Sequence, residues 1–127
     1  RLGRDGQSVS MASYRAHTQD YIRVARILLD VAEPLAAQPA PAGRDLLLVQ
    51  RARDVAQYLI ELYLRFPPDR ETGLALRRYD EMLCQTYPHI AAIMTNKNTR
   101  LLRAGRYLPY RTLSAWARGK QSNGGIL

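Results

Sequence analysis

The sequence predicts an all-α protein, a three- or four-helix bundle followed by a basic, partly extended C-terminal segment. Apolar residues recur every three or four positions over most of the chain, which is the period of a helix with one buried face. No stretch alternates between apolar and polar residues with the β-branched enrichment of a strand. The third observation is charge: residues 97–127 contain seven Lys and Arg and no Asp or Glu. The length of 127 residues fits one domain.

The first helix is expected over residues 11–36, after a polar, glycine-containing arm at residues 1–10. Ser10 is a suitable cap for its start, and Pro34 should kink or end it near Glu33, because proline lacks an amide donor. Its apolar stripe, which we expect to face the core, consists of Met11, Tyr14, Tyr21, Val24, Leu28, Val31 and Leu35.

A second helix is expected over residues 44–66, where Pro67 and Pro68 end it, and a third over residues 69–86, with Asp69 as its cap. The expected inner stripe of the second helix is Leu46, Val49, Ala52, Ala56, Leu59, Tyr63 and Phe66. The expected inner face of the third is Leu74, Leu76, Tyr79, Met82 and Leu83.

A fourth helix should begin at Pro88, because proline suits the first helical position, and break at the polar residues 96–98. A short helix should then run to Gly105, and one or two further turns over residues 112–118 should stop at Gly119. We therefore divide the chain into an arm at residues 1–10, a helical bundle at 11–96 and a cationic extension at 97–127.

The charge of the chain is concentrated at one end. Residues 1–96 carry a net charge of +1 and residues 97–127 carry +7, which together give +8. An all-positive segment repels itself unless an anion lies near, and arginine binds phosphate and carboxylate bidentately. The residues expected to bind a polyanion are Lys97, Arg100, Arg103, Arg106, Arg111, Arg118 and Lys120.

Three aromatic residues lie among these cations. Tyr107 and Tyr110 flank a proline, and Trp116 follows six residues later. Aromatic rings interleaved with arginines can stack on bases while the guanidinium groups hold phosphates. The alternative interpretation is that these rings pack the extension against the bundle. The other tyrosines, Tyr14, Tyr21, Tyr58, Tyr63, Tyr79 and Tyr87, are expected in or near the core.

No catalytic, cofactor or metal-binding motif is present in the sequence. Cys84 and His89 are five residues apart across Pro88, but no third group completes a nucleophile–base arrangement. We expect Cys84 to be a small buried thiol and His89 to be a surface imidazole. The single cysteine excludes an intramolecular disulfide framework, and no apolar run reaches the roughly 18 residues of a membrane span.

Two segments have a partial resemblance to known motifs. The spacing of Leu108, Leu113 and Trp116 resembles the buried positions of a helix-turn-helix, with residues 112–118 as recognition helix, although Tyr107 stands where that motif has its turn glycine. Within Glu61–Arg65, Tyr63 and Arg65 resemble the Leu-Tyr-Arg signature of small accessory proteins of mitochondrial complexes, with Leu64 intervening.

The sequence thus favours a non-catalytic, helical accessory or structural subunit of a large organellar or ribonucleoprotein assembly. Its expected partners are neighbouring protein subunits and an anionic surface, either RNA or lipid headgroups. The alternatives are a helix-turn-helix DNA-binding regulator and a protein-only accessory subunit of a mitochondrial respiratory-type complex. The first residue is Arg, so either Met11 is the natural start or a preceding segment has been removed. We favour removal of a transit peptide, which predicts an intracellular, mitochondrial location.

Overall fold

A computed structural model describes the backbone of residues 2–126 and the side chains of residues 16–119. Within that backbone range every regular element is an α-helix and there is no strand, so the all-α prediction is confirmed. The helices are α1 (Leu2–Ala36), α2 (Gly43–Arg65), α3 (Arg70–Thr86), α4 (Pro88–Ala92), α5 (Lys97–Ala104) and α6 (Tyr110–Ile126).

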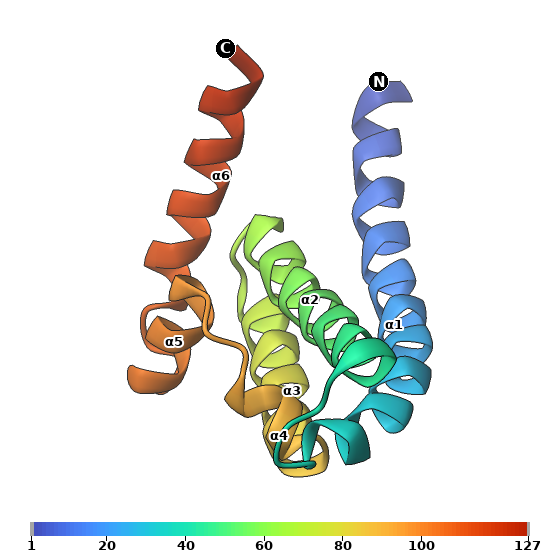
Figure 1. Ribbon diagram of the computed structural model, residues 1–127. Coiled ribbons are helices and arrows are strands. Elements are labelled where there is room, and N and C mark those ends of the chain that lie inside the picture. Colours follow the sequence, from blue (N-terminus) through green and yellow to red (C-terminus); the bar gives the residue numbers. More distant parts are fainter. Residues whose placement is uncertain (1, 127) are drawn as a thin grey trace.

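The helix α2 is the centre of the arrangement. It runs antiparallel to α1, packs against α3 and α6 on its other sides, and touches α4 and α5 (Figure 1). Small side chains, Ala25 and Ala32 of α1 and Ala52 and Ala56 of α2, are almost fully buried and let the two helix axes approach closely. Leu29, Leu59 and Ile60 are fully buried in the same core.

The face that α1 buries differs from the predicted one. Thr18, Ala25, Leu29 and Ala32 are buried, whereas Tyr21, Val24 and Val31 of the expected inner stripe are more than half exposed. Both sets have three- and four-residue spacing, so periodicity alone favours neither. The set with smaller side chains packs against α2. The helix also begins at Leu2, within the expected arm, and continues through Pro34 to Ala36.

The predictions for α2 and α3 are largely confirmed. Of the expected α2 stripe only Leu46 is exposed. On α3, Leu76, Tyr79 and Leu83 are buried and Met82 is partly buried, whereas Leu74, which we expected on the inner face, is exposed. The Asp69 carboxylate accepts a hydrogen bond of 2.7 Å from the backbone N–H of Thr72, as an N-cap does. This bond satisfies one of the free amides in the first turn of α3.

The short helix α4 is capped from a distant part of the chain. The Glu33 carboxylate, at the end of α1, accepts hydrogen bonds of 3.0 Å from the backbone N–H groups of His89 and Ile90. The same carboxylate lies 2.6 Å from Nδ1 of His89. Glu33 therefore fixes the start of α4 against the end of α1.

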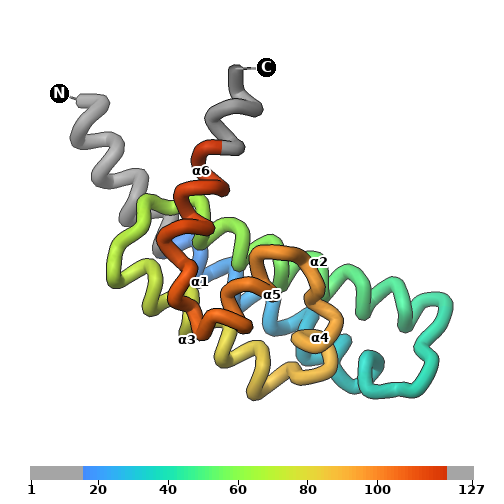
Figure 2. The backbone as a smooth tube through the Cα atoms, turned by 90° about the vertical axis from the view of Figure 1, so that its left-hand side faces the viewer, coloured from blue at the N-terminus to red at the C-terminus, as the bar shows by residue number. Residues whose placement is uncertain are grey.

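The C-terminal segment is more helical than the partly extended form that the sequence predicts, although a short helix ending at Gly105 was expected. Residues 97–104 form α5, and α6 begins at Tyr110 and passes through Gly119, where we expected it to stop. Figure 2 shows α5 and the first turns of α6 lying against the preceding helices. The cause is apolar burial: Leu102, Tyr110 and Leu113 join the core.

Among the residues described, no helix is both long enough and apolar enough to span a bilayer.

Candidate anion-binding surface

The cationic segment is fixed to the bundle through one buried carboxylate. Asp80 of α3 is 1% exposed, and Arg103 of α5 donates to it from Nε at 3.0 Å and from Nη2 at 2.8 Å. Nη1 of Arg103 donates to the carbonyl oxygen of Ala91 at 2.8 Å. The hydroxyl of Tyr107 donates to Asp80 at 2.7 Å. Arg103 and Tyr107, which we expected to contact a partner, therefore stabilise the fold instead.

The ionisation of this cluster follows from its burial. Burial lowers the pKa of Arg103, but its hydrogen bond and charge interaction with Asp80 outweigh that effect, and the net pKa is raised. Burial first, and then the hydrogen bond to Asp80, raise the pKa of Tyr107. Arg103 is thus held as a cation and Tyr107 as a neutral donor at physiological pH.

The turn between α5 and α6 has an unusual backbone. Arg106 and Tyr107 have φ angles of 52° and 68°, in the left-handed region that glycine tolerates best. The N–H of Tyr107 donates to the carbonyl oxygen of Leu102 at 2.7 Å, and that of Arg106 donates to Arg103 at 3.3 Å. These two bonds are those of a Schellman motif, with Arg106 at the position that glycine usually occupies. The turn directs Arg106 outward while Tyr107 reaches Asp80.

Tyr110 also belongs to the core. It is buried, and its ring lies so close to Gly73 of α3 that a Cβ there would sit 3.0 Å from it. One turn later the hydroxyl of Ser114 donates to the carbonyl oxygens of Leu64 at 2.9 Å and Phe66 at 3.3 Å. These contacts fix α6 on the end of α2. The packing interpretation is therefore correct for Tyr107 and Tyr110.

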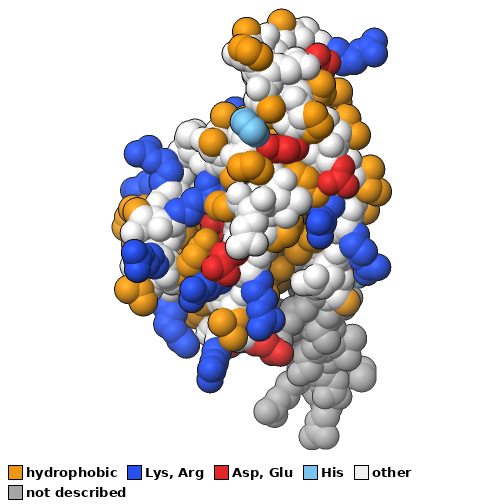
Figure 3. All heavy atoms as spheres, turned by 90° about the horizontal axis from the view of Figure 1, so that it is seen from below, with side chains coloured by type: hydrophobic (Ala, Val, Ile, Leu, Met, Phe, Trp, Pro, Cys, Tyr) orange, Lys and Arg blue, Asp and Glu red, His pale blue; other side chains and the backbone are white. Residues whose placement is uncertain are grey.

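Four of the predicted cations remain exposed on this scaffold: Lys97, Arg100, Arg106 and Arg111. Among the side chains of residues 16–119, no carboxylate lies within 4.0 Å of any of them. Lys97 and Arg100 line a shallow hollow of about 300 Å³ on α5. In Figure 3, blue side chains gather at the left, the side on which α5 lies in Figure 1. Arg118 is half-buried, and the side chain of Lys120 lies outside the described residues.

Trp116 differs from the two tyrosines. It is 64% exposed on α6, and the Lys97 ammonium lies 5.1 Å from the centre of its ring. Both residues line a groove of about 610 Å³ whose other walls include Arg65 and Asn98. Asn98 and Asn96 are held by Glu61, whose carboxylate accepts hydrogen bonds from both side-chain amides. The groove therefore combines an exposed flat ring with two cations, Lys97 and Arg65, and with the Glu61 carboxylate, which also lines it.

Cys84 is exposed on α3, so the expected burial of this thiol is wrong; partial burial of the sulfur nevertheless raises its pKa. A raised pKa is the opposite of what an activated thiolate needs. Tyr63, Tyr79 and Tyr87 are buried as expected, whereas Tyr21 and Tyr58 are half exposed, and the side chain of Tyr14 lies outside the described residues.

The helix-turn-helix resemblance depends on three buried positions. Only Leu113 is buried; Leu108 is 89% exposed and Trp116 is largely exposed. The predicted recognition helix, residues 112–118, lies within α6, which packs against α2. In the Glu61–Arg65 segment, Tyr63 and Leu64 are buried in α2 and Arg65 is exposed.

The residue that sequence reasoning missed is Asp80, which carries the main polar contact between α3 and α5. A signal was present: Asp80 lies four residues after Leu76 and three before Leu83, on the buried face of α3. An acidic residue on such a face requires a partner, but the sequence does not indicate which arginine supplies it.

Within the part of the chain whose side chains are described, no group of three or more His, Cys, Asp or Glu is placed to bind a metal ion.

Comparison with models of protein families finds no match to this chain. Comparison with curated proteins finds none. Comparison with solved structures also finds none.

Proposed function

We propose that this protein is a non-catalytic accessory subunit of a larger assembly, and that it binds an anionic partner through α5, the following turn and the start of α6. The observation that carries the proposal is the charge of this surface. Lys97, Arg100, Arg106 and Arg111 are exposed, none has a carboxylate of the described side chains within 4.0 Å, and residues 97–127 contain no acid.

The partner that these features favour is single-stranded RNA. Arginines bind phosphates through their planar fork, and an exposed tryptophan beside a cation offers a face on which a base can stack. Trp116 and Lys97 supply that combination within one groove. Phospholipid headgroups and acidic protein faces offer negative charge but no base to stack.

Binding of a mixed-sequence single-stranded RNA to the full chain tests the proposal. We expect replacement of Lys97, Arg100, Arg106 and Arg111 by glutamine to weaken binding at least tenfold, since each neutralised phosphate contributes to affinity. The matched control replaces four exposed arginines elsewhere, namely Arg23, Arg44, Arg70 and Arg78, and removes the same net charge.

Equal loss of affinity in both variants would show that only the net charge matters and would refute the assignment to this surface. Binding confined to palindromic duplex DNA would instead support the regulator alternative. Binding to anionic vesicles but not to RNA would assign the surface to lipid.

A further inference from the structure

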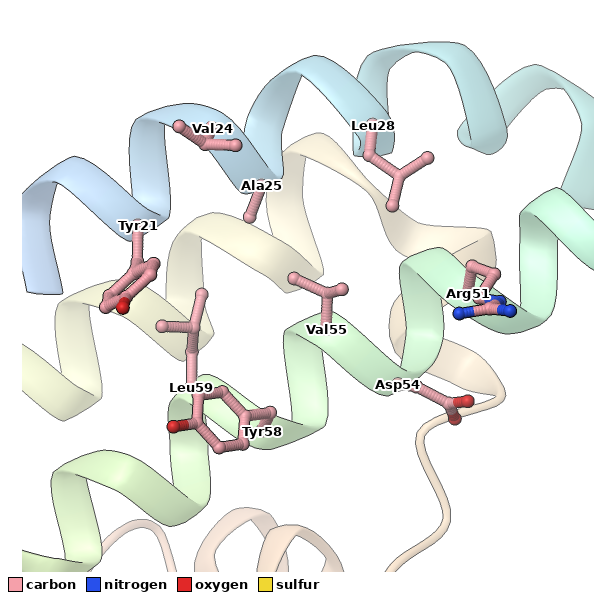
Figure 4. A pocket seen from close by; sticks show the side chains of 9 residues that line it. All are labelled: Tyr21, Val24, Ala25, Leu28, Arg51, Asp54, Val55, Tyr58 and Leu59. Carbon is pink, nitrogen blue, oxygen red and sulfur yellow. The ribbon is translucent and has the colours of Figure 1, made fainter.

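A second surface, on the α1/α2 face, has a different chemistry. Tyr21, Val24 and Leu28 of α1 and Val55 and Tyr58 of α2 line an apolar groove of about 520 Å³. Figure 4 shows side chains from both helices bordering this groove, with Arg51 and Asp54 on the α2 side. Ile27 and Val31 extend the exposed apolar stripe along α1 and are 69% and 53% exposed. Large, contiguous, exposed apolar surface is typical of a protein interface.

The exposed residues of α2 form a self-complementary row, which could pack antiparallel against the same row of a second copy. Leu47, Arg51, Asp54 and Tyr58 follow one another at spacings of four, three and four residues, so they lie on one side of the helix. All four are exposed. If a second α2 ran antiparallel, centred between residues 51 and 54, Arg51 would oppose Asp54 of the other copy. In the same register, Leu47 would oppose Tyr58 of the other copy.

The charge of this face also permits two copies to meet. The chain as a whole carries +8, which drives copies apart, but the groove contains one arginine and one aspartate and is neutral. Among the described side chains no carboxylate lies within 4.0 Å of Arg51, and Asp54 pairs only with its neighbour Arg53 at the surface.

We propose that the α1/α2 face binds a second copy of this chain, as a two-fold symmetric dimer in which the α2 helices pack antiparallel along Leu47, Arg51, Asp54 and Tyr58. An isologous interface uses the same patch twice, which is what a self-complementary row of residues supplies. The apolar stripe of α1, including Val24 and Val31, flanks the α2 pair and excludes water from the Arg51–Asp54 contacts.

Sedimentation equilibrium of the full chain over a range of concentrations tests the dimer. We expect the wild type to dimerise, and Arg51→Asp and Asp54→Arg each to be monomeric where the wild type is dimeric. Each reversal places like charges opposite one another twice, which should raise the dissociation constant roughly tenfold or more. Leu108→Glu, which introduces a charge at an exposed position outside the groove, is the control and should leave the dimer unchanged.

The decisive sample is a mixture of the two reversed variants. In a heterodimer of Arg51→Asp with Asp54→Arg, both contacts again join opposite charges, so the mixture should dimerise although neither variant does alone. Circular dichroism of each variant verifies that it is folded. A monomeric wild type, reversed variants that stay dimeric, or a mixture that stays monomeric would each overturn the proposal.

Discussion

Arg103 holds the buried carboxylate of Asp80 through two near-parallel hydrogen bonds, of 3.0 Å from Nε and 2.8 Å from Nη2. This contact joins α5 to α3, twenty-three residues earlier in the chain. Arg103 therefore stabilises the packing of α5 on α3, whereas the other cations of α5, Lys97 and Arg100, are exposed. The cationic surface is therefore a folded feature rather than an unstructured tail.

We expect Arg103→Ala to lower the free energy of unfolding by about 3 kcal/mol, because it leaves a buried carboxylate without its partner. Arg100→Ala, on the exposed side of the same helix, should change it by less than about 0.5 kcal/mol. Urea denaturation of both variants measures the difference. Similar effects of the two substitutions would show that the Asp80 contact does not anchor α5.

A second prediction concerns the turn after α5. Arg106 occupies a left-handed position, so Arg106→Gly should raise the free energy of unfolding by about 1 kcal/mol. The same substitution removes an exposed cation and should weaken RNA binding. Thermal unfolding together with a binding titration shows whether stability and affinity change in opposite directions. A destabilised Gly variant would contradict the assignment of the turn.

The capping of α4 gives a third prediction. Glu33→Ala removes the acceptor shared by the His89 and Ile90 amides and should cost about 1–2 kcal/mol of stability. Asp45→Ala, which removes an acid from the first turn of α2 without a side-chain cap bond, should cost less than about 1 kcal/mol. Equal losses in chemical denaturation would refute a specific role for Glu33.

The tyrosines predict how stability changes at alkaline pH. The folded state raises the pKa of Tyr107 through burial and Asp80, so above pH about 10 the unfolded chain loses its tyrosine protons first. The contribution of Tyr107 to the free energy of unfolding is therefore complete below about pH 10 and decreases as the pH rises. The Tyr107→Phe variant should be less stable than the wild type at pH 8, because it loses the hydrogen bond to Asp80. Its free energy of unfolding should then fall less steeply than that of the wild type between pH 9 and 11. Denaturation at several pH values tests this, and an unchanged slope would contradict it.

Local signals in the sequence were sufficient for much of the fold. Helical periodicity located α2 and α3, and the Asp69 cap and the Pro88 start of α4 follow from residue type alone. For α1, two apolar stripes share the helical period, and only packing against Ala52 and Ala56 of α2 decides which one is buried. Periodicity therefore located this helix but did not identify the face that it buries.

The candidate site was predictable in composition but not in arrangement. The absence of acids after residue 96 identified the cationic segment. Which of its members are exposed depends on contacts with residues far away in sequence: Arg103 and Tyr107 meet Asp80, and Tyr110 packs on Gly73. Such long-range contacts leave no local pattern, so seven apparently equivalent cations could not be separated before the fold was known.

The salt dependence of RNA binding tests the central claim most directly, namely that the exposed cations of α5, the turn and α6 contact phosphates. With four contacts to single-stranded RNA, a plot of log affinity against log salt concentration should have a slope of about −3. The variant with glutamine at Lys97, Arg100, Arg106 and Arg111 should have a much shallower slope, set by the cations that remain, and Arg103→Ala, if folded, should keep the wild-type slope. A flat wild-type slope, or an unchanged slope in the four-residue variant, would contradict the account.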